Sequence, residues 1–308
     1  CQGQSQCGLA VSACGSAAKI FRRCPLKDRR QISILGSKGM LGTDLMACCR
    51  KKNLNVQGYD LPEFDITDAP SLKKIVSASS CIVNCAAYTN VDRAEQEEPL
   101  AEQINGHSVG VLARLAGGAD IPVVHISTDF VFDGMQDRPY LETDLPNLIN
   151  AYGRSKLEGE KQLAAAGCRY CILRVEWTYG RAGVNFVKKI LEAAQTRPVL
   201  KVVDDQIGSP TAVKEIAAVI GQILERKEFP EGIFHLAAAG YISRYEMARF
   251  IGRIKGIHTP IEPCKTADFP SPAKRPLNSR FNCSKIETLL GKKMKSWQES
   301  LTEFLEQL

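Results

Sequence analysis

The sequence lacks three features that would each point to a particular class of protein. It has no run of roughly 18 or more apolar residues, so we expect no transmembrane helix. It has no internal repeat and no low-complexity tract. It also has no pair of CxxC motifs that would suit zinc, because Cys168 and Cys171 form the only such motif and their segment is predicted to be a buried strand. Most of the 12 cysteines are therefore expected to be reduced and buried, as is typical of a cytoplasmic protein.

A concentrated basic surface is missing from most of the chain. The net charge is +6, but residues 1–30 contain six basic residues and one acidic residue, so the rest of the chain is nearly neutral. Because nucleic-acid binding needs a concentrated basic face, we expect neither nucleic acid nor a membrane as a partner. We expect the basic segment itself, which lacks an initiator methionine, to be a disordered extension.

Strands alternate with helices from residue 31 onward. Runs of β-branched and apolar residues predict five strands, at residues 31–35, 55–59, 81–84, 123–127 and 170–175. Strands with this composition are typical of a parallel sheet that helices cover on both faces. The sequence therefore predicts an α/β fold, with a Rossmann-type doubly wound parallel sheet over residues 31–176. Residues 177–308 are expected to form a smaller C-terminal substrate-binding subdomain, partly interwoven with the sheet.

Three glycines with the spacing GxxGxxG follow the first predicted strand. Gly36 allows a tight turn, Gly39 lets the backbone approach a pyrophosphate, and Gly42 lets the next helix pack close to the strand. The free N–H groups at the start of that helix can bind the anion. The loop therefore predicts a dinucleotide site. Its further expected contacts are Lys38, Met40 and Leu41.

The carboxyl ends of the next strands supply further candidates for the cofactor site. Asp60 can accept hydrogen bonds from the adenosine ribose and would repel a 2′-phosphate, which modestly favours NADH over NADPH; alternatively, it caps the following turn. Asp65 and Ile66 are expected near the adenine. Ala86 and Ala87 let the backbone approach a ligand, or else serve only helix–sheet packing. The choice between NADPH and NADH stays open.

Tyr152 and Lys156 are four residues apart on a predicted helix and so share one face. A tyrosine has a pKa of about 10, and a nearby ammonium would lower that pKa enough to make it a usable proton donor. The lysine can also bind the nicotinamide ribose. Ser127 and Thr128 end the fourth strand, where the Thr128 hydroxyl could bind a substrate carbonyl together with Tyr152. The alternative for these two residues is a simple turn at a strand end.

Longer segments resemble the extended short-chain dehydrogenase/reductase superfamily and, within it, the dTDP-4-dehydrorhamnose reductase family. The matching segments are NCAAYTNVDRAE at 84–95, HISTDFVFDG at 125–134, YGRSK at 152–156, RVEWTYG at 174–180, DQIGSPT at 205–211 and RPLNSR at 275–280. The resemblance covers nearly all of residues 31–308. It implies that NADPH or NADH reduces the 4-keto group of dTDP-4-dehydro-6-deoxy-L-mannose to give dTDP-L-rhamnose.

The resemblance also implies roles for particular residues. Thr128, Tyr152 and Lys156 match the family's catalytic residues, with Tyr152 as the proton donor. The implied substrate contacts are Tyr88, Thr89, Val91, Thr128, Asp129, Trp177, Gln206 and Arg275. Some relatives require Mg²⁺ at a dimer contact, but no full ligand set maps onto this sequence, so we predict no metal site and leave a homodimer open.

Two residues depart from the family pattern. Glu176 precedes Trp177 where a small residue such as serine is usual, and it is expected either to alter substrate fit or to point outward. Phe130 replaces a tyrosine, which we expect to be a change in the core with little consequence.

Two alternative functions remain on the same scaffold. One is another sugar-nucleotide epimerase or ketoreductase, which would differ only in its pocket contacts. The other is a non-catalytic subunit resembling the regulatory β subunit of methionine adenosyltransferase, which segments 131–134 and 245–248 also fit. Segments 88–91 and 177–180 fit the reductase better.

Overall fold

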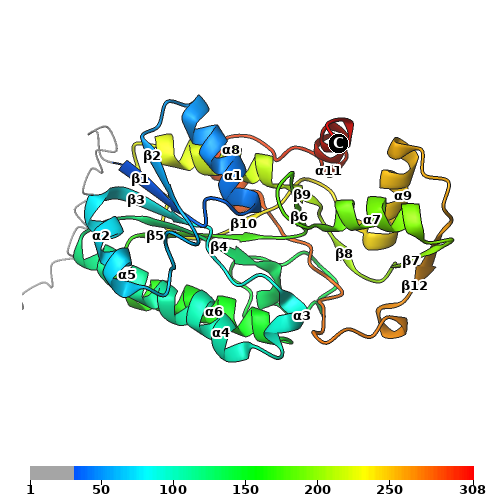
Figure 1. Cartoon of the computed structure of the whole chain (residues 1–308), viewed down its shortest axis with the longest axis horizontal. Coiled ribbons are helices and arrows are strands. Elements are labelled where there is room, and N and C mark those ends of the chain that lie inside the picture. Colours follow the sequence, from blue (N-terminus) through cyan, green and yellow to red (C-terminus); the bar gives the residue numbers. More distant parts are fainter. Residues whose placement is uncertain (1–30) are drawn as a thin grey trace, which may run out of the picture.

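A six-stranded parallel sheet forms the centre of the computed structural model, which describes residues 31–308 (Figure 1). In spatial order its strands are β2 (Val56–Tyr59), β1 (Gln31–Leu35), β3 (Ser79–Asn84), β4 (Val123–Thr128), β5 (Tyr170–Val175) and β10 (Gly232–Leu236). All neighbouring strands pair in parallel. The direction of winding reverses between β1 and β3, which opens a crevice at the carboxyl ends of the strands. The predicted α/β class is confirmed; the prediction for residues 1–30 lies outside the described residues.

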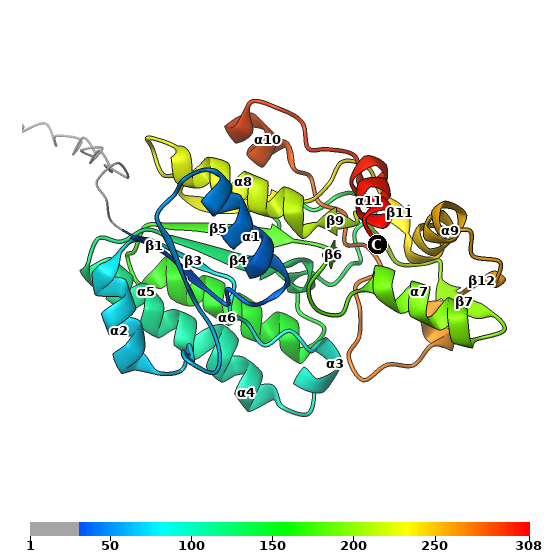
Figure 2. The same cartoon turned by 45° about the horizontal axis from the view of Figure 1, so that its top comes forward.

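Helices cover both faces of the sheet (Figures 1 and 2). One face carries α1 (Met40–Lys51), α8 (Val213–Glu225) and α10 (Ser284–Leu290). The other carries α2 (Ala69–Ala78), α5 (Ser108–Gly118) and α6 (Ala151–Ala165). Short helices α3 (Val91–Ala94) and α4 (Glu98–Glu102) and a π-turn (Gln103–His107) lead into α5 and pack along α6. Each face is sealed by apolar residues, such as Leu45 and Ile220 on one side and Leu72 and Leu112 on the other.

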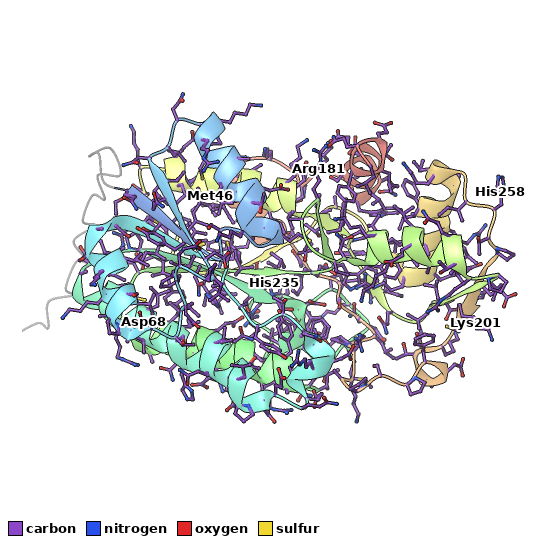
Figure 3. All side chains as sticks on the ribbon, in the orientation of Figure 1. Met46, Asp68, Arg181, Lys201, His235 and His258 are labelled. Carbon is purple, nitrogen blue, oxygen red and sulfur yellow. The ribbon has the colours of Figure 1, made fainter. Side chains whose placement is uncertain are left out.

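A second, smaller core lies beyond the carboxyl ends of the strands. It joins α7 (Phe186–Thr196), α9 (Arg244–Lys255) and α11 (Trp297–Glu306) around Ile190, Met247 and Leu301. Its short strands are β6 (Thr178–Tyr179), β7 (Leu200–Val203), β8 (Ile207–Gly208), β9 (Thr211–Ala212), β11 (Ile242–Ser243) and β12 (Ile261–Cys264). Between these elements, α8 and β10 return to the central sheet, so the chain crosses between the two cores more than once. In Figure 3, His258 and Lys201 lie at the outer end of this part, while His235 of β10 lies centrally.

A buried ion pair fixes α6 against the sheet. The Glu160 carboxylate on α6 accepts hydrogen bonds from Arg174 on β5, at 3.0 Å from Nε and 2.6 Å from Nη2, and from the Ser127 hydroxyl on β4 at 2.5 Å. Arg174 and Glu160 are 2% and 3% exposed, so the pair is shielded from water and its geometry is held tightly. Glu160 therefore sets the position of the helix that carries Tyr152 and Lys156 relative to the strand that ends at Thr128.

Candidate active site

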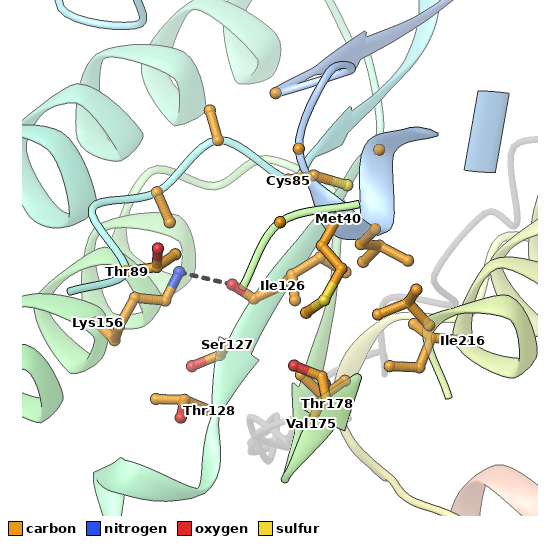
Figure 4. A pocket seen from close by; sticks show the side chains of 18 of the residues that line it. Met40, Cys85, Thr89, Ile126, Ser127, Thr128, Lys156, Val175, Thr178 and Ile216 are labelled. Carbon is orange, nitrogen blue, oxygen red and sulfur yellow. Dashed lines mark hydrogen bonds between the residues drawn. The ribbon is translucent and has the colours of Figure 1, made fainter. Parts of the chain in front are cut away.

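A cavity of about 800 Å³ opens at the carboxyl ends of β1, β3, β4 and β5 and extends to α7 and α9. Nineteen of the predicted site residues line it: Gly36, Lys38, Gly39, Met40, Leu41, Gly42, Asp60, Asp65, Ile66, Ala86, Ala87, Thr89, Val91, Ser127, Thr128, Asp129, Tyr152, Lys156 and Trp177. Figure 4 shows part of this lining, with Met40, Lys156 and Thr128 around the same space. The cavity joins the predicted cofactor contacts to most of the predicted substrate contacts.

The glycine loop at the start of α1 has no room for a side chain at two of its positions. Gly36 has a φ of 74°, and a Cβ there would lie 2.6 Å from the backbone nitrogen of Ala86. A Cβ on Gly42 would lie 2.1 Å from the Gly36 carbonyl oxygen. No side chain caps the N-terminus of α1, so its first N–H groups are available. This cradle fits a pyrophosphate and therefore a dinucleotide cofactor.

Asp60 supports the same loop while facing the cavity. Its carboxylate accepts hydrogen bonds from two backbone N–H groups, that of Lys38 at 2.6 Å and that of Leu61 at 2.8 Å. The Lys38 ammonium lies nearby and pairs with Glu63 at the surface. Asp60 thus caps the turn, as one alternative held, and it also lines the cavity.

Thr128 links the end of β4 to Tyr152. Its hydroxyl oxygen accepts the Phe130 N–H at 3.2 Å, which closes the turn that the sequence left as an alternative. The hydroxyl donates to the Asp129 carboxylate at 3.0 Å, and the side chains of Thr128 and Tyr152 are hydrogen-bonded. The Tyr152 ring packs edge-on against Phe130, with 5.6 Å between ring centroids. Phe130 lines the cavity, so its expected placement in the core is wrong.

Burial is the main cause that raises the pKa of Tyr152, and the negative charge of Asp129 acts in the same direction. The Lys156 ammonium donates to the Ile126 carbonyl oxygen at 2.6 Å (Figure 4). The pKa of Tyr152 is thus raised in this structure, where the sequence led us to expect a lowered pKa. The phenol keeps its proton at neutral pH, which is the state that a proton donor needs.

Lys156 is only 2% exposed, although it lines the cavity. Burial lowers its pKa to about 8, while Glu160 and the Cys85 thiol act in the opposite direction. One of its three protons goes to Ile126, which leaves two donors for a ligand.

Arg244 is the main charged residue that sequence reasoning missed. Its guanidinium carbon lies 3.5 Å from the centroid of the Trp177 ring and 4.9 Å from that of Phe186. Burial lowers the pKa of Arg244 to about 9, against the charges of Asp129 and Glu176. Within residues 31–308 its guanidinium makes no hydrogen bond and no close ion pair, so its donors are available to a ligand. No motif marks Arg244, because α9 reaches the site only through tertiary packing.

Glu176 points inward, so the outward alternative is wrong. It is 1% exposed, and its two oxygens accept the N–H groups of Ser209 at 2.8 Å and Phe281 at 3.3 Å. Burial and the nearby Asp129 hold the pKa of Glu176 well above its usual value. These two hydrogen bonds join the end of β5 to two distant loops behind Trp177. The backbone φ of Trp177 is 46°, which is unusual for a bulky residue.

Three predicted substrate contacts do not line the cavity. The Tyr88 hydroxyl donates to Glu97 at 2.6 Å. The Gln206 side-chain amide donates to the Thr266 hydroxyl. The Arg275 guanidinium pairs with Asp92 at 2.7 Å. The polar ends of these three side chains therefore bind to neighbouring segments of the chain. Further cavity residues that the sequence did not indicate are Leu61, Phe64, Cys85, Ile104, Ile126, Val175, Thr178, Gly183, Val184, Phe186, Val213 and Ile216.

The dinucleotide cradle beside a protonated tyrosine places this protein among the short-chain dehydrogenases and reductases of the extended type. Residues 30–308 match the family model described as the RmlD substrate binding domain. With the relatives described next, this match shows that the chain belongs to the dTDP-4-dehydrorhamnose reductase family.

Relatives of known name resemble the chain over most of its length. The dTDP-4-dehydrorhamnose reductase of Sinorhizobium fredii is 38% identical over 283 residues, which cover 88% of this chain and 95% of the relative. The dTDP-4-keto-6-deoxy-D-glucose reductase of Streptomyces niveus is 39% identical over 226 residues, covering 72% of this chain and 78% of the relative. The solved structure of the Bacillus anthracis dTDP-4-dehydrorhamnose reductase in complex with NADP has a TM-score of 0.86 and 33% identity, and covers 91% of this chain and 99% of that one.

Proposed function

We propose that this protein reduces the 4-keto group of dTDP-4-dehydro-6-deoxy-L-mannose to give dTDP-L-rhamnose, using NADPH or NADH. The observation that carries the proposal is the position of Tyr152. Its phenol, which keeps its proton, lies where the dinucleotide cradle meets a pocket walled by Trp177. The names of the relatives, and the NADP bound to one of them, support the same reaction.

The chain's own groups orient the reactants and supply the proton. When bound, the nicotinamide cofactor supplies a hydride to the carbonyl carbon of the substrate. Tyr152 gives its proton to the oxygen that becomes the alkoxide. Thr128, whose side chain is hydrogen-bonded to Asp129 and to Tyr152 and lines the cavity, helps to hold that oxygen. The N–H groups at the start of α1, beside Gly39, would hold the pyrophosphate, and Lys156 has two protons left for the ribose.

Arg244 fits the diphosphate of the sugar nucleotide. A guanidinium presents planar donors that match phosphate oxygens, and its charge opposes that of the diphosphate. The Trp177 ring, stacked against it, fixes the plane of the guanidinium. The substrate would then extend from the keto group at Tyr152 toward α9.

A second candidate is the same reduction on a dTDP-4-keto sugar of another configuration. The Streptomyces niveus relative bears the name of such an enzyme. In addition, Glu176 points inward behind Trp177, where the family pattern has a small residue. The two candidates share every chemical step and differ only in which sugar fits.

Turnover assays test the proposal. We expect dTDP-4-dehydrorhamnose to oxidise NADPH or NADH, followed by the loss of nicotinamide absorbance, with dTDP-L-rhamnose identified by NMR. Turnover of other dTDP-4-keto sugars alone would favour the second candidate. Binding of the cofactor with no turnover of any such sugar would overturn the proposal in favour of a non-catalytic subunit.

The Tyr152→Phe variant tests the catalytic assignment. We expect kcat to fall by about 10²–10⁴-fold, because the variant loses general-acid catalysis but no contact of the cradle. The dissociation constant for NADPH, measured by fluorescence, should change little. An undiminished kcat would refute the role of Tyr152.

Other parts of the sequence-based picture remain predictions. Among residues 31–308 no group of three or more His, Cys, Asp or Glu side chains is arranged to hold a metal ion, and the proposed reaction assigns no step to one. No helix in the described part of the chain is long and apolar enough to cross a membrane. A cytoplasmic location and a homodimer are predicted from the sequence alone.

A further inference from the structure

A buried histidine lies directly behind Lys156 and has no part in the mechanism above. His125 of β4 is 0% exposed and does not line the cavity. Its Nδ1 lies 3.1 Å from the side-chain nitrogen of Asn84, the residue beside it on β3. Its Nε2 lies 3.5 Å from Nζ of Lys156. The ring thus bridges the end of β3 and a lysine of the proposed active site.

The orientation of Asn84 determines which ring nitrogen of His125 carries the proton. The Asn84 side-chain oxygen accepts the Ala86 N–H at 3.1 Å, so the amide nitrogen faces the ring. An amide nitrogen only donates, which makes Nδ1 of His125 the acceptor. Burial, reinforced by the charge of Lys156, holds the pKa of His125 well below its usual value, so the ring is neutral. Its single proton is therefore on Nε2.

The Nε2–H group then points at the Lys156 ammonium. An ammonium also only donates, so the two groups cannot form a hydrogen bond while Lys156 is charged. Lys156 does have an acceptor in the Ile126 carbonyl oxygen, and Glu160 favours the ammonium through its charge. Glu160, on the same helix, is already held by Arg174 and Ser127. Burial raises the pKa of the Cys85 thiol to about 12, so it is uncharged at neutral pH.

We propose that His125 is a positioning residue for Lys156: its fixed Nε2–H tautomer directs the free protons of Lys156 into the cavity and makes the ammonium form less stable. The inference rests on the proposed function, because Lys156 is taken to face the cofactor ribose. The pKa of Lys156, which burial lowers to about 8, is shifted in the same direction.

The tautomer can be read without any variant. Nitrogen NMR on protein labelled with ¹⁵N-histidine should show His125 with a protonated Nε2 and an unprotonated Nδ1. A Nδ1–H ring or a doubly protonated ring would overturn the inference. Because this measurement needs no substrate, it decides the inference even where the proposed reaction fails.

Asn84→Asp tests the consequence for Lys156. One oxygen of the new carboxylate can still accept the Ala86 N–H, while the other accepts a proton from Nδ1. The ring then carries its proton on Nδ1, and Nε2 becomes an acceptor for Lys156. We expect the Lys156 titration, followed through its ¹³Cε signal and assigned with Lys156→Arg, to move up by about one pH unit, or tenfold in proton affinity. The alkaline limb of kcat/KM should move with it.

The negative charge that Asn84→Asp introduces needs a matched control. In the His125→Phe background the same Asn84→Asp change brings the charge but no tautomer switch. We expect a clearly smaller shift there than in the protein that keeps His125. Equal shifts in both backgrounds, or no shift in either, would overturn the inference. A wild-type protein with the expected tautomer and titration but no turnover would instead refute only the proposed reaction.

Discussion

At the scale of single residues, the site depends on the acceptor to which each polar group already donates its hydrogen bond. The Thr128 hydroxyl gives its proton to Asp129, and the second Asp129 oxygen accepts the Ser279 hydroxyl at 2.5 Å. Asp129 therefore orients Thr128, and its charge adds to the effect of burial, which is the main reason that the Tyr152 phenol stays protonated. A sequence motif can indicate that these residues belong together, but it does not indicate the direction of their hydrogen bonds.

Residues at strand ends were predictable, and those from the smaller core were not. Thr128, Ala86 and Gly36 follow different strands, and parallel strands end at one edge of a sheet, so their meeting follows from the pattern alone. Arg244 and Phe186 come from α9 and α7, whose docking depends on packing around Met247 and Leu301. Nothing local to either residue indicates its place in the cavity.

Arg244→Met should weaken binding of the sugar nucleotide. Each hydrogen bond to a charged group contributes about 1.5–3 kcal/mol, so we expect the affinity for dTDP to fall by roughly 10- to 100-fold. The stem of methionine keeps contact with Trp177 while the charge is lost. Calorimetry with dTDP measures the change, and NADPH binding serves as the control because the cradle is untouched. Unchanged dTDP affinity would show that Arg244 is not the diphosphate contact.

At the scale of elements, the predicted boundaries agree best where local pattern decides them. The predicted strands 31–35 and 170–175 coincide with β1 and β5. β3 begins at Ser79, two residues before the prediction, because the buried Ser79 and Ser33 hydroxyls hydrogen-bond at 2.6 Å across the two strands. Such a polar pair has no apolar pattern to indicate it.

Residues 91–118 show the opposite case, because the alternation of strands and helices predicts helical segments there without their boundaries. They divide into α3, α4, the π-turn and α5. Within the π-turn, Asn105 bonds the backbone of Tyr88 and the hydroxyl of Ser155 on α6. These partners are distant in sequence, so helical periodicity does not predict the turn.

Gly42→Ala should damage the cofactor cradle. The new Cβ would meet backbone atoms of Gly36 and Ser37, which cannot move without opening the loop. We expect a lower melting temperature and at least about tenfold weaker NADPH binding, because the N–H groups of α1 would be displaced. Gly118→Ala, at the end of α5, is the matched control, since a Cβ there meets nothing within 4 Å. It should leave binding unchanged and stabilise by up to about 1 kcal/mol. Equal NADPH binding by both variants would contradict the role of the loop.

At the scale of the whole molecule, the two cores share the chain and the cavity. α8 and β10 lie between segments of the smaller core in sequence, yet they pack with the central sheet. Glu176 adds a further link, because it joins β5 to the loops at Ser209 and Phe281. The interwoven subdomain predicted for residues 177–308 thus contains elements that belong spatially to the sheet. Motions of one core relative to the other would change the cavity between Tyr152 and Arg244.

His235 lies at the junction of several of these segments and should make stability depend on pH. On β10 its ring stacks on Phe281 at 4.0 Å between centroids, and its Nδ1 donates to the Tyr140 carbonyl at 3.0 Å. Burial, reinforced by the nearby Arg174, lowers the pKa of His235 to about 3. The unfolded chain has the usual value near 6.5. Between these two values the unfolded state binds more protons, so acidification favours unfolding.

His235→Asn isolates that contribution, because an asparagine side-chain nitrogen can still donate to Tyr140 while the titrating ring is gone. The free energy of unfolding of the wild type relative to the variant should fall by about 1.4 kcal/mol per pH unit as the pH drops below 6.5. Glu176, whose raised pKa gives the opposite dependence, is present in both proteins and cancels in the difference. Urea unfolding at pH 7 and at pH 5 measures it, and we expect a total change of about 2 kcal/mol because only the range below pH 6.5 contributes. His258→Asn, at an exposed site, should run parallel to the wild type. A difference between wild type and His235→Asn that stays constant with pH would mean that His235 is protonated in the folded protein, and that its aromatic surroundings do not exclude the charge.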